Sequence, residues 1–129
     1  MAILRATGQT PQAAGGNGIT SIQVTLPQNI VAGNAIMAVG KSRNAGTTTF
    51  SDNLANTWGK DVENITGDAD NNIAIGSAKK ITAGGACTVT FTTTAAANRM
   101  GLSVMEYSGF TGGAVFDQSA SAIGTSTSP

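Results

Sequence analysis

The side chains that most often transfer protons or bind metals are scarce in this chain of 129 residues. It has no histidine, one cysteine and seven acidic residues, and charged residues make up 11% of the sequence. Histidine is the usual general acid or base near neutral pH and the commonest metal ligand. Without it, most hydrolytic, redox and zinc chemistry is hard to assemble. We therefore expect a protein that is not an enzyme and has no cofactor.

Glu106 and Asp117 are the only carboxylates after Asp70. A glycosidase needs two carboxylates that face each other across a sugar. Glu106 shares a predicted strand face with Leu102 and Val104, which predicts a partly buried carboxylate that accepts hydrogen bonds from backbone amides or a hydroxyl. Because the chain is small and poor in aromatic residues, we expect no substrate pocket and assign no catalytic residue.

Two short motifs resemble ligand sites but fail at defining positions. Residues 35–42 differ at the first position from the phosphate-binding pattern G-x-x-x-x-G-K-[ST], and an apolar run replaces the glycine-rich loop. Asp68, Asp70 and Asn72 have the spacing of the first calcium ligands, but Ile73 stands where a calcium loop needs glycine. We interpret the first motif as coincidence. The second we interpret as a polar turn, with calcium as the weaker alternative, and we assign no metal site.

Three aromatic residues, Trp58, Tyr107 and Phe110, are the candidates for an interface. Aromatic faces stack on sugar rings, so one interpretation is a lectin-like surface. The other interpretation of Trp58 is core packing, in which it and Phe50 bracket the turn at 51–57, since large aromatic residues are mostly buried. Phe110 lies in a glycine-rich loop and is the best candidate for an exposed anchor.

Alternation with a period of two dominates the sequence. In residues 87–92, Cys87, Val89 and Phe91 share one face and threonines occupy the other. The single cysteine cannot form an intramolecular disulfide, so we expect Cys87 to be a small buried residue. Further strands are predicted at 21–26, 35–39, 58–65, 73–79 and 102–107.

Two of these strands carry additional expectations. The run at 35–39 is continuously apolar, which is typical of a central strand covered on both faces. In the strand at 58–65, simple alternation puts Trp58, Lys60, Val62 and Asn64 on one face. Short strands separated by turn-rich segments predict an all-β antiparallel sandwich, either jelly-roll or immunoglobulin-like.

The chain is long enough for one domain. We expect residues 1–18 to be an N-terminal arm or edge strand, 19–118 the sandwich, and 119–129 a Ser/Thr/Gly-rich C-terminal arm. Seven basic and seven acidic residues give a net charge of zero, without the basic stripe of a nucleic-acid-binding protein. No apolar run is long enough for a membrane span or for the core of a signal peptide, so we expect synthesis without a leader.

Three segments together resemble a known family: 51–58 (SDNLANTW), 106–109 (EYSG), and 117–120 (DQSA) running into 124–129 (GTSTSP). The family is a Gly/Thr-rich β-sandwich module of phage structural proteins and bacterial surface proteins. The resemblance covers roughly residues 19–129 and carries over no catalytic residue. Many members of the family continue beyond the position that corresponds to Pro129.

These features favour a virion structural protein, and in particular a phage capsid decoration (cement) protein on the capsid surface. Its partner would be the major capsid protein or another virion protein. A capsid offers symmetric sites, so we expect a homo-oligomer, with a trimer as one form. The alternative is a carbohydrate-binding or adhesion module of a bacterial surface protein or a phage tail fibre. That module would be extracellular or on the cell surface and would expose Trp58 or Tyr107 to a glycan.

Overall fold

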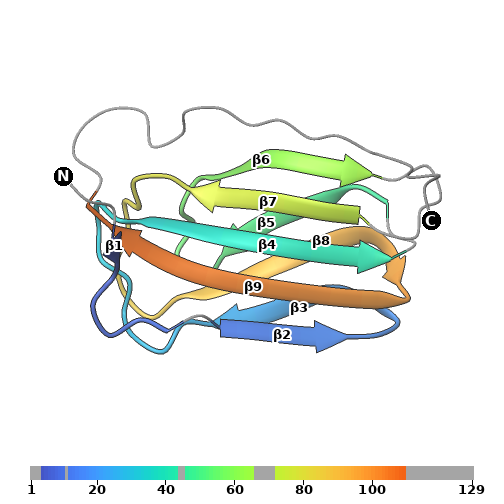
Figure 1. Ribbon diagram of the computed structural model, residues 1–129, viewed down its shortest axis with the longest axis horizontal. Helices are drawn as coiled ribbons and strands as arrows, with labels where there is room; N and C mark the ends of the chain where they lie inside the picture. Colours follow the sequence, from blue (N-terminus) through green and yellow to red (C-terminus); the bar gives the residue numbers. More distant parts are fainter. Residues whose placement is uncertain (1–3, 11, 44–45, 66–71, 110–129) are drawn as a thin grey trace, which may run out of the picture.

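The computed structural model describes residues 4–10, 12–43, 46–65 and 72–109. Over these residues the chain forms two antiparallel β-sheets that pack face to face, which confirms the predicted all-β sandwich (Figure 1). The larger sheet, in front in Figure 1, contains β1 (Leu4–Arg5), β2 (Gln12–Gly16), β4 (Ala35–Arg43), β6 (Trp58–Ile65), β7 (Asn72–Ala78) and β9 (Arg99–Ser108). The smaller sheet contains β3 (Ile19–Thr25), β5 (Thr48–Asp52) and β8 (Thr88–Ala97).

The strands pair in a nested order. β2 pairs with β9, β3 with β8 and β4 with β7, while β4 also pairs with β9 and β5 with β8. Nested antiparallel pairs divided between two sheets are the arrangement of a jelly roll. The observed strand order therefore agrees with the first of the two expected topologies. β6 departs from it, because it pairs with β7 in the larger sheet instead of extending the smaller sheet beside β5.

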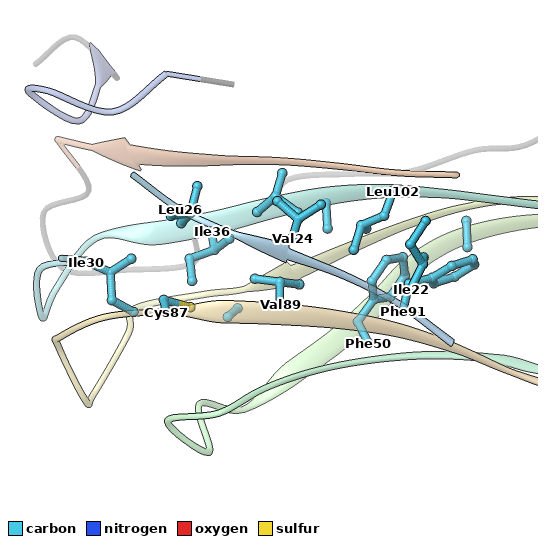
Figure 2. Close-up of a cluster of buried hydrophobic side chains, with 14 of the residues drawn as sticks. Ile22, Val24, Leu26, Ile30, Ile36, Phe50, Cys87, Val89, Phe91 and Leu102 are labelled. Atoms are coloured by element: carbon cyan, nitrogen blue, oxygen red, sulfur yellow. The ribbon is translucent and has the colours of Figure 1, made fainter. Parts of the chain in front are cut away.

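Side chains from both sheets fill the layer between them (Figure 2). The smaller sheet contributes Val89 and Phe91, and the larger sheet contributes Ile36 and Leu102, all of them buried. The alternation predicted for residues 87–92 is confirmed, since the apolar members point into this layer and the threonines point away from it.

Two glycines make room for aromatic rings in this layer. Gly40 on β4 faces Phe91, and Gly76 on β7 faces Phe50. A Cβ atom built on Gly40 would lie 2.6 Å from Cδ2 and Cζ of Phe91, and one on Gly76 would lie 2.8 Å from Cγ of Phe50. These distances are far below van der Waals contact, so the rings fit only because both positions lack a side chain.

The central position of β4 is confirmed, but the expectation that both of its faces are covered is wrong. β4 lies between β9 and β7, and its residues alternate between buried and exposed. Met37 is 43% exposed and Val39 is 44% exposed. The smaller sheet covers only one side of the larger one, and nothing among the described residues covers the other side of β4 enough to bury these two side chains.

Simple alternation over β6 is also wrong. The pairing of β6 with β7 shifts between Lys60 and Val62, so Asp61 is the extra residue of a β-bulge. A bulge reverses the order of faces along the strand that follows it. The register therefore places Trp58, Lys60 and Glu63 on the inner face, and Val62 and Asn64 on the outer face.

Two segments form strands although their local sequence gives little sign of it. β5 is a strand although its residues, TTFSD, show little hydrophobic alternation. The alanine-rich stretch at 94–99, the only one with helical propensity, belongs to the end of β8 and the start of β9. Pairing with neighbouring strands overrides weak local propensity at both places.

Candidate interaction surface

The side of the larger sheet that points away from the smaller sheet is called the outer face below. Met37 and Val39 on β4 and Ile73 on β7 lie on it, exposed by 43%, 44% and 46%. Because residues two apart in a strand share a face, β4 and β7 each direct their alternate residues to solvent here. Large apolar side chains at this exposure are the unusual feature of the described surface.

The strand register joins these residues into one patch. Met37 lies opposite Met105 of β9, and Val39 lies opposite Ile75 of β7. Ile75 in turn lies opposite Val62 of β6. We call these residues the apolar centre: Met37, Val39, Val62, Ile73, Ile75 and Met105. Met37, Val39 and Ile73 are exposed, and the other three are half-buried. Contiguous, partly exposed apolar side chains of this kind mark surfaces that bind other molecules.

The outer face of the smaller sheet has a different character. Thr25 and Thr88 hydrogen-bond to each other through their hydroxyls at 2.9 Å, and Gln23 Nε2 donates to Thr90 Oγ1 at 3.2 Å. Hydroxyl and amide side chains cover this face and satisfy one another across the strands. Of the two outward-facing surfaces, the larger sheet's is therefore the better candidate for a docking surface.

The three predicted interface residues have different positions. Tyr107 is half-buried and lies on the outer face, where Arg5 and Ala35 are its cross-strand neighbours. Trp58 is also half-buried but belongs to the inner face and packs against the core. Phe110 lies outside the described residues. Sequence reasoning missed the apolar centre, although Ile73 and Ile75, two residues apart, were a signal for it.

Trp58 is held from two sides. Its ring stacks on Phe50 with a centroid separation of 5.8 Å and an interplanar angle of 20°. Its indole N–H donates to Oδ2 of Asp52 at 2.8 Å, and Oδ1 of Asp52 accepts from the backbone N–H groups of Leu54 and Asn56. The SDNLANTW segment is thus a turn clamped by Asp52, and the tryptophan is one of its fixed parts.

Glu106 is buried between the sheets, at 1% exposure. Its Oε1 accepts hydrogen bonds from the backbone N–H of Val31 at 2.9 Å and from Nδ2 of Asn34 at 2.7 Å. Its Oε2 accepts from Nε2 of Gln9 at 2.6 Å. The predicted hydrogen bond from a backbone amide is confirmed. The other two donors are the side-chain amides of Asn34 and Gln9, and neither is the hydroxyl that was the predicted alternative. The carboxylate ties the N-terminal segment and the loop before β4 to β9.

A second polar group lies where β5 meets β6. Glu63 accepts hydrogen bonds from Thr48, Asn72 and Lys60 and forms an ion pair with Lys60. Partial burial is the largest single influence on the pKa of Glu63, and it raises that pKa. The hydrogen bonds donated by Lys60, Thr48 and Asn72 together outweigh burial, so the pKa of Glu63 is lowered. Ser42 on β4 lies opposite Asn72, and its buried Oγ has no hydrogen-bond partner among the residues that the structure describes.

The two ligand-like motifs can now be placed. Residues 35–42 lie within β4, where the backbone amides belong to strand pairing and no helix follows. Asn72 is buried on β7 and donates to Glu63, whereas Asp68 and Asp70 lie outside the described residues. Among the described residues, no three His, Cys, Asp or Glu side chains gather in a way that could hold a metal ion.

Cys87 is fully buried in the core. Burial raises the pKa of its thiol from the ordinary 9.0 to about 12, and the carboxylates of Asp52 and Glu106 add to the shift. A thiol with these properties is a poor nucleophile at neutral pH. The prediction of a small buried side chain at this position is confirmed.

The free energy of unfolding is expected to fall as the pH rises from about 9 towards 12, because the unfolded chain releases the Cys87 proton over this range and the folded chain keeps it. This thiol contributes a slope of at most about 1.4 kcal/mol per pH unit. Urea unfolding of the wild type and of Cys87→Ala at several pH values isolates the contribution, since every other ionisable group is common to the two proteins. If the free energies of unfolding of the two proteins change with pH in parallel, the folded protein does not hold the Cys87 proton more tightly than the unfolded chain does.

No helix within the described part of the chain is long and apolar enough to cross a membrane. Comparison with protein-family models, with curated proteins and with solved structures finds no match for this chain. The resemblance to the Gly/Thr-rich module therefore stays a prediction, and the assignment of function depends on the surface described above.

Proposed function

We propose that this chain is a non-enzymatic virion structural protein, a phage capsid decoration (cement) protein that binds the capsid through the outer face of its larger sheet. The observation that carries the proposal is the apolar centre on that face. The sandwich fills its own interior, so these side chains are not needed for the core. Burying them against a shell would add apolar contact area and hold neighbouring capsid subunits together.

The fold fits this role but does not select it. Jelly-roll sandwiches occur in viral capsid proteins and also in lectins, and a fold by itself does not define a function. The carbohydrate-binding alternative needs an exposed aromatic platform. Trp58 is engaged by Phe50 and Asp52, which leaves Tyr107 as the only predicted aromatic on the outer face among the described residues. The surface therefore favours docking to a protein over stacking on a sugar.

Decoration proteins act at symmetric positions, so the proposal includes a homo-oligomer, with a trimer matching a threefold site. The contacts between copies would involve the strand edges, the loops or the terminal arms. Such contacts leave the outer face available for the capsid.

The test is co-sedimentation with empty shells, which are assembled from the major capsid protein encoded nearest to the gene of this chain. We expect the chain to pellet with the shells at a saturating and symmetric ratio and to raise their melting temperature. Sedimentation of the chain alone gives the oligomeric state. If the chain stays in the supernatant at micromolar concentrations and instead retains glycans on an array, the adhesion alternative replaces the proposal.

A further inference from the structure

Positive charge is concentrated on the outer face. The chain has seven Lys and Arg residues, and the strand register with the ion pairs assigns five of them to this face. Lys41, Arg43 and Arg99 project where β4 ends and β9 begins, while Arg5 and Lys79 lie at the opposite end of the sheet. The remaining two, Lys60 and Lys80, lie on the inner side of β6 and in the loop after β7.

The carboxylates of the described residues are mostly elsewhere. Glu106 and Glu63 lie between the sheets, and Asp52 holds the turn that contains Trp58. Asp61 is on the outer face, where it accepts a hydrogen bond from Ser77 and pairs with Lys79 at 2.7 Å. Over the described residues, the outer face thus has an apolar centre and an excess of positive charge at both ends.

We infer that the partner of the outer face is an acidic protein surface with an apolar middle. The inference rests on the proposed function and names the chemistry of the capsid surface that it requires. Lys41 and Arg99 would meet carboxylates, and Val39 would pack against apolar side chains between them. Complementary charge of this kind speeds association and fixes orientation, whereas buried apolar contacts supply most of the affinity.

The charge distribution also distinguishes this partner from two others. If two copies met through their outer faces, either relative orientation would bring basic ends together, since cations outnumber carboxylates at both ends over the described residues. Nucleic acid is bound mainly through phosphates, which need cations and hydrogen-bond donors across the whole contact. Met37, Val39 and Ile75, which lie between the two ends of the face, offer neither. An acidic protein surface with an apolar middle offers carboxylates to the cations at both ends and apolar side chains to the apolar centre.

The experiment measures binding of the chain to the capsid shells described above, with variants in matched pairs. Lys41→Glu on the outer face is compared with Lys80→Glu, which makes the same charge change in a loop. Val39→Thr in the apolar centre is compared with Val31→Thr, an exposed valine outside it. Thermal unfolding of every variant confirms that the sandwich is intact, and hydrogen exchange maps the contact on the wild type.

We expect Lys41→Glu to lower the association rate constant about tenfold at low salt, with the difference shrinking as salt is added. We expect Val39→Thr to raise the dissociation constant roughly three- to tenfold, mainly through faster dissociation. Lys80→Glu and Val31→Thr should change either constant by less than about twofold. Hydrogen exchange should slow in β4, β7 and β9 on binding.

Each other outcome overturns a stated part of the argument. If the wild type binds shells but both outer-face variants bind equally well, or protection falls on the smaller sheet, the outer face is not the docking surface and the acidic partner is wrong, while the decoration role itself stands. If the wild type does not bind, both proposals fail together. Salt-sensitive binding to duplex DNA that Lys41→Glu abolishes, or a dimer that Val39→Thr dissociates, would assign the face to the corresponding partner instead.

Discussion

Replacing Glu106 with alanine is expected to lower the free energy of unfolding by about 3–5 kcal/mol, one of the largest losses for any single substitution in this chain. The carboxylate accepts three hydrogen bonds, from Gln9, Val31 and Asn34. Its removal leaves these donors without an acceptor. Gln9 is itself only 1% exposed, so water cannot easily replace the lost partner.

The conservative variant Glu106→Gln sharpens this prediction. Glutamine has the same shape, so it creates no cavity. Its NH2 group, however, must take the place of a carboxylate oxygen and face an N–H donor that the oxygen accepted from. Rotation of the Gln9 amide can relieve part of this conflict. We therefore expect a loss of about 1–2 kcal/mol, smaller than for alanine but well above that of an exposed substitution.

Urea unfolding at neutral pH measures both losses, and Gln23→Ala is the control. Gln23 on β3 also donates a hydrogen bond to a side chain of the neighbouring strand, Thr90 on β8, but this bond is exposed. We expect this control to stay within about 0.5 kcal/mol of the wild type. If Glu106→Ala loses no more than the control, the carboxylate does not hold the N-terminal segment and the loop before β4 in place.

The sequence predicted the fold class well because the alternation at 87–92 and 102–107 is regular. In the first segment the apolar residues point into the core, and in the second Leu102 and Val104 do so with Glu106 in the same register. Its partners could not be predicted, because Gln9 is 97 residues away and nothing local indicates that the two side chains meet. Long-range polar contacts of this kind depend on topology, and the pattern of one strand does not encode topology.

The outer face was misjudged because apolar character alone does not say which side of a strand is covered. On β7, Ile73 and Ile75 are the large residues, yet Ala74 and Gly76 face the core. The ring of Phe50 occupies the space over Gly76, so volume on the opposite sheet decides the orientation. The bulge at Asp61 changed the faces of β6 for a similar reason, since one extra residue reverses the pattern. Neither effect can be read from a single strand.

The last prediction tests the packing of an aromatic ring against a glycine at the second such contact, between Phe91 and Gly40. Gly40→Ala is expected to lower the free energy of unfolding by about 2–3 kcal/mol, because the new Cβ would overlap the ring of Phe91 and neither strand has room to move. Phe91 is fully buried in the middle of β8, between β3 and β5, so its ring cannot swing out to solvent. Gly101→Ala is the matched control, since its Cβ would meet its nearest neighbour at an ordinary 3.8 Å. We expect that control to be neutral or slightly stabilising.

A double-mutant cycle with Phe91→Leu separates overlap from other effects of the substitution at Gly40. Phe91→Leu alone leaves unfilled space and should cost about 1–2 kcal/mol. In the double variant the methyl group at position 40 partly occupies that space. The combined loss should therefore fall at least about 1 kcal/mol short of the sum of the two single losses, as expected for residues that share one volume. Additive losses would mean that the substitution at Gly40 does not act through overlap with the ring of Phe91.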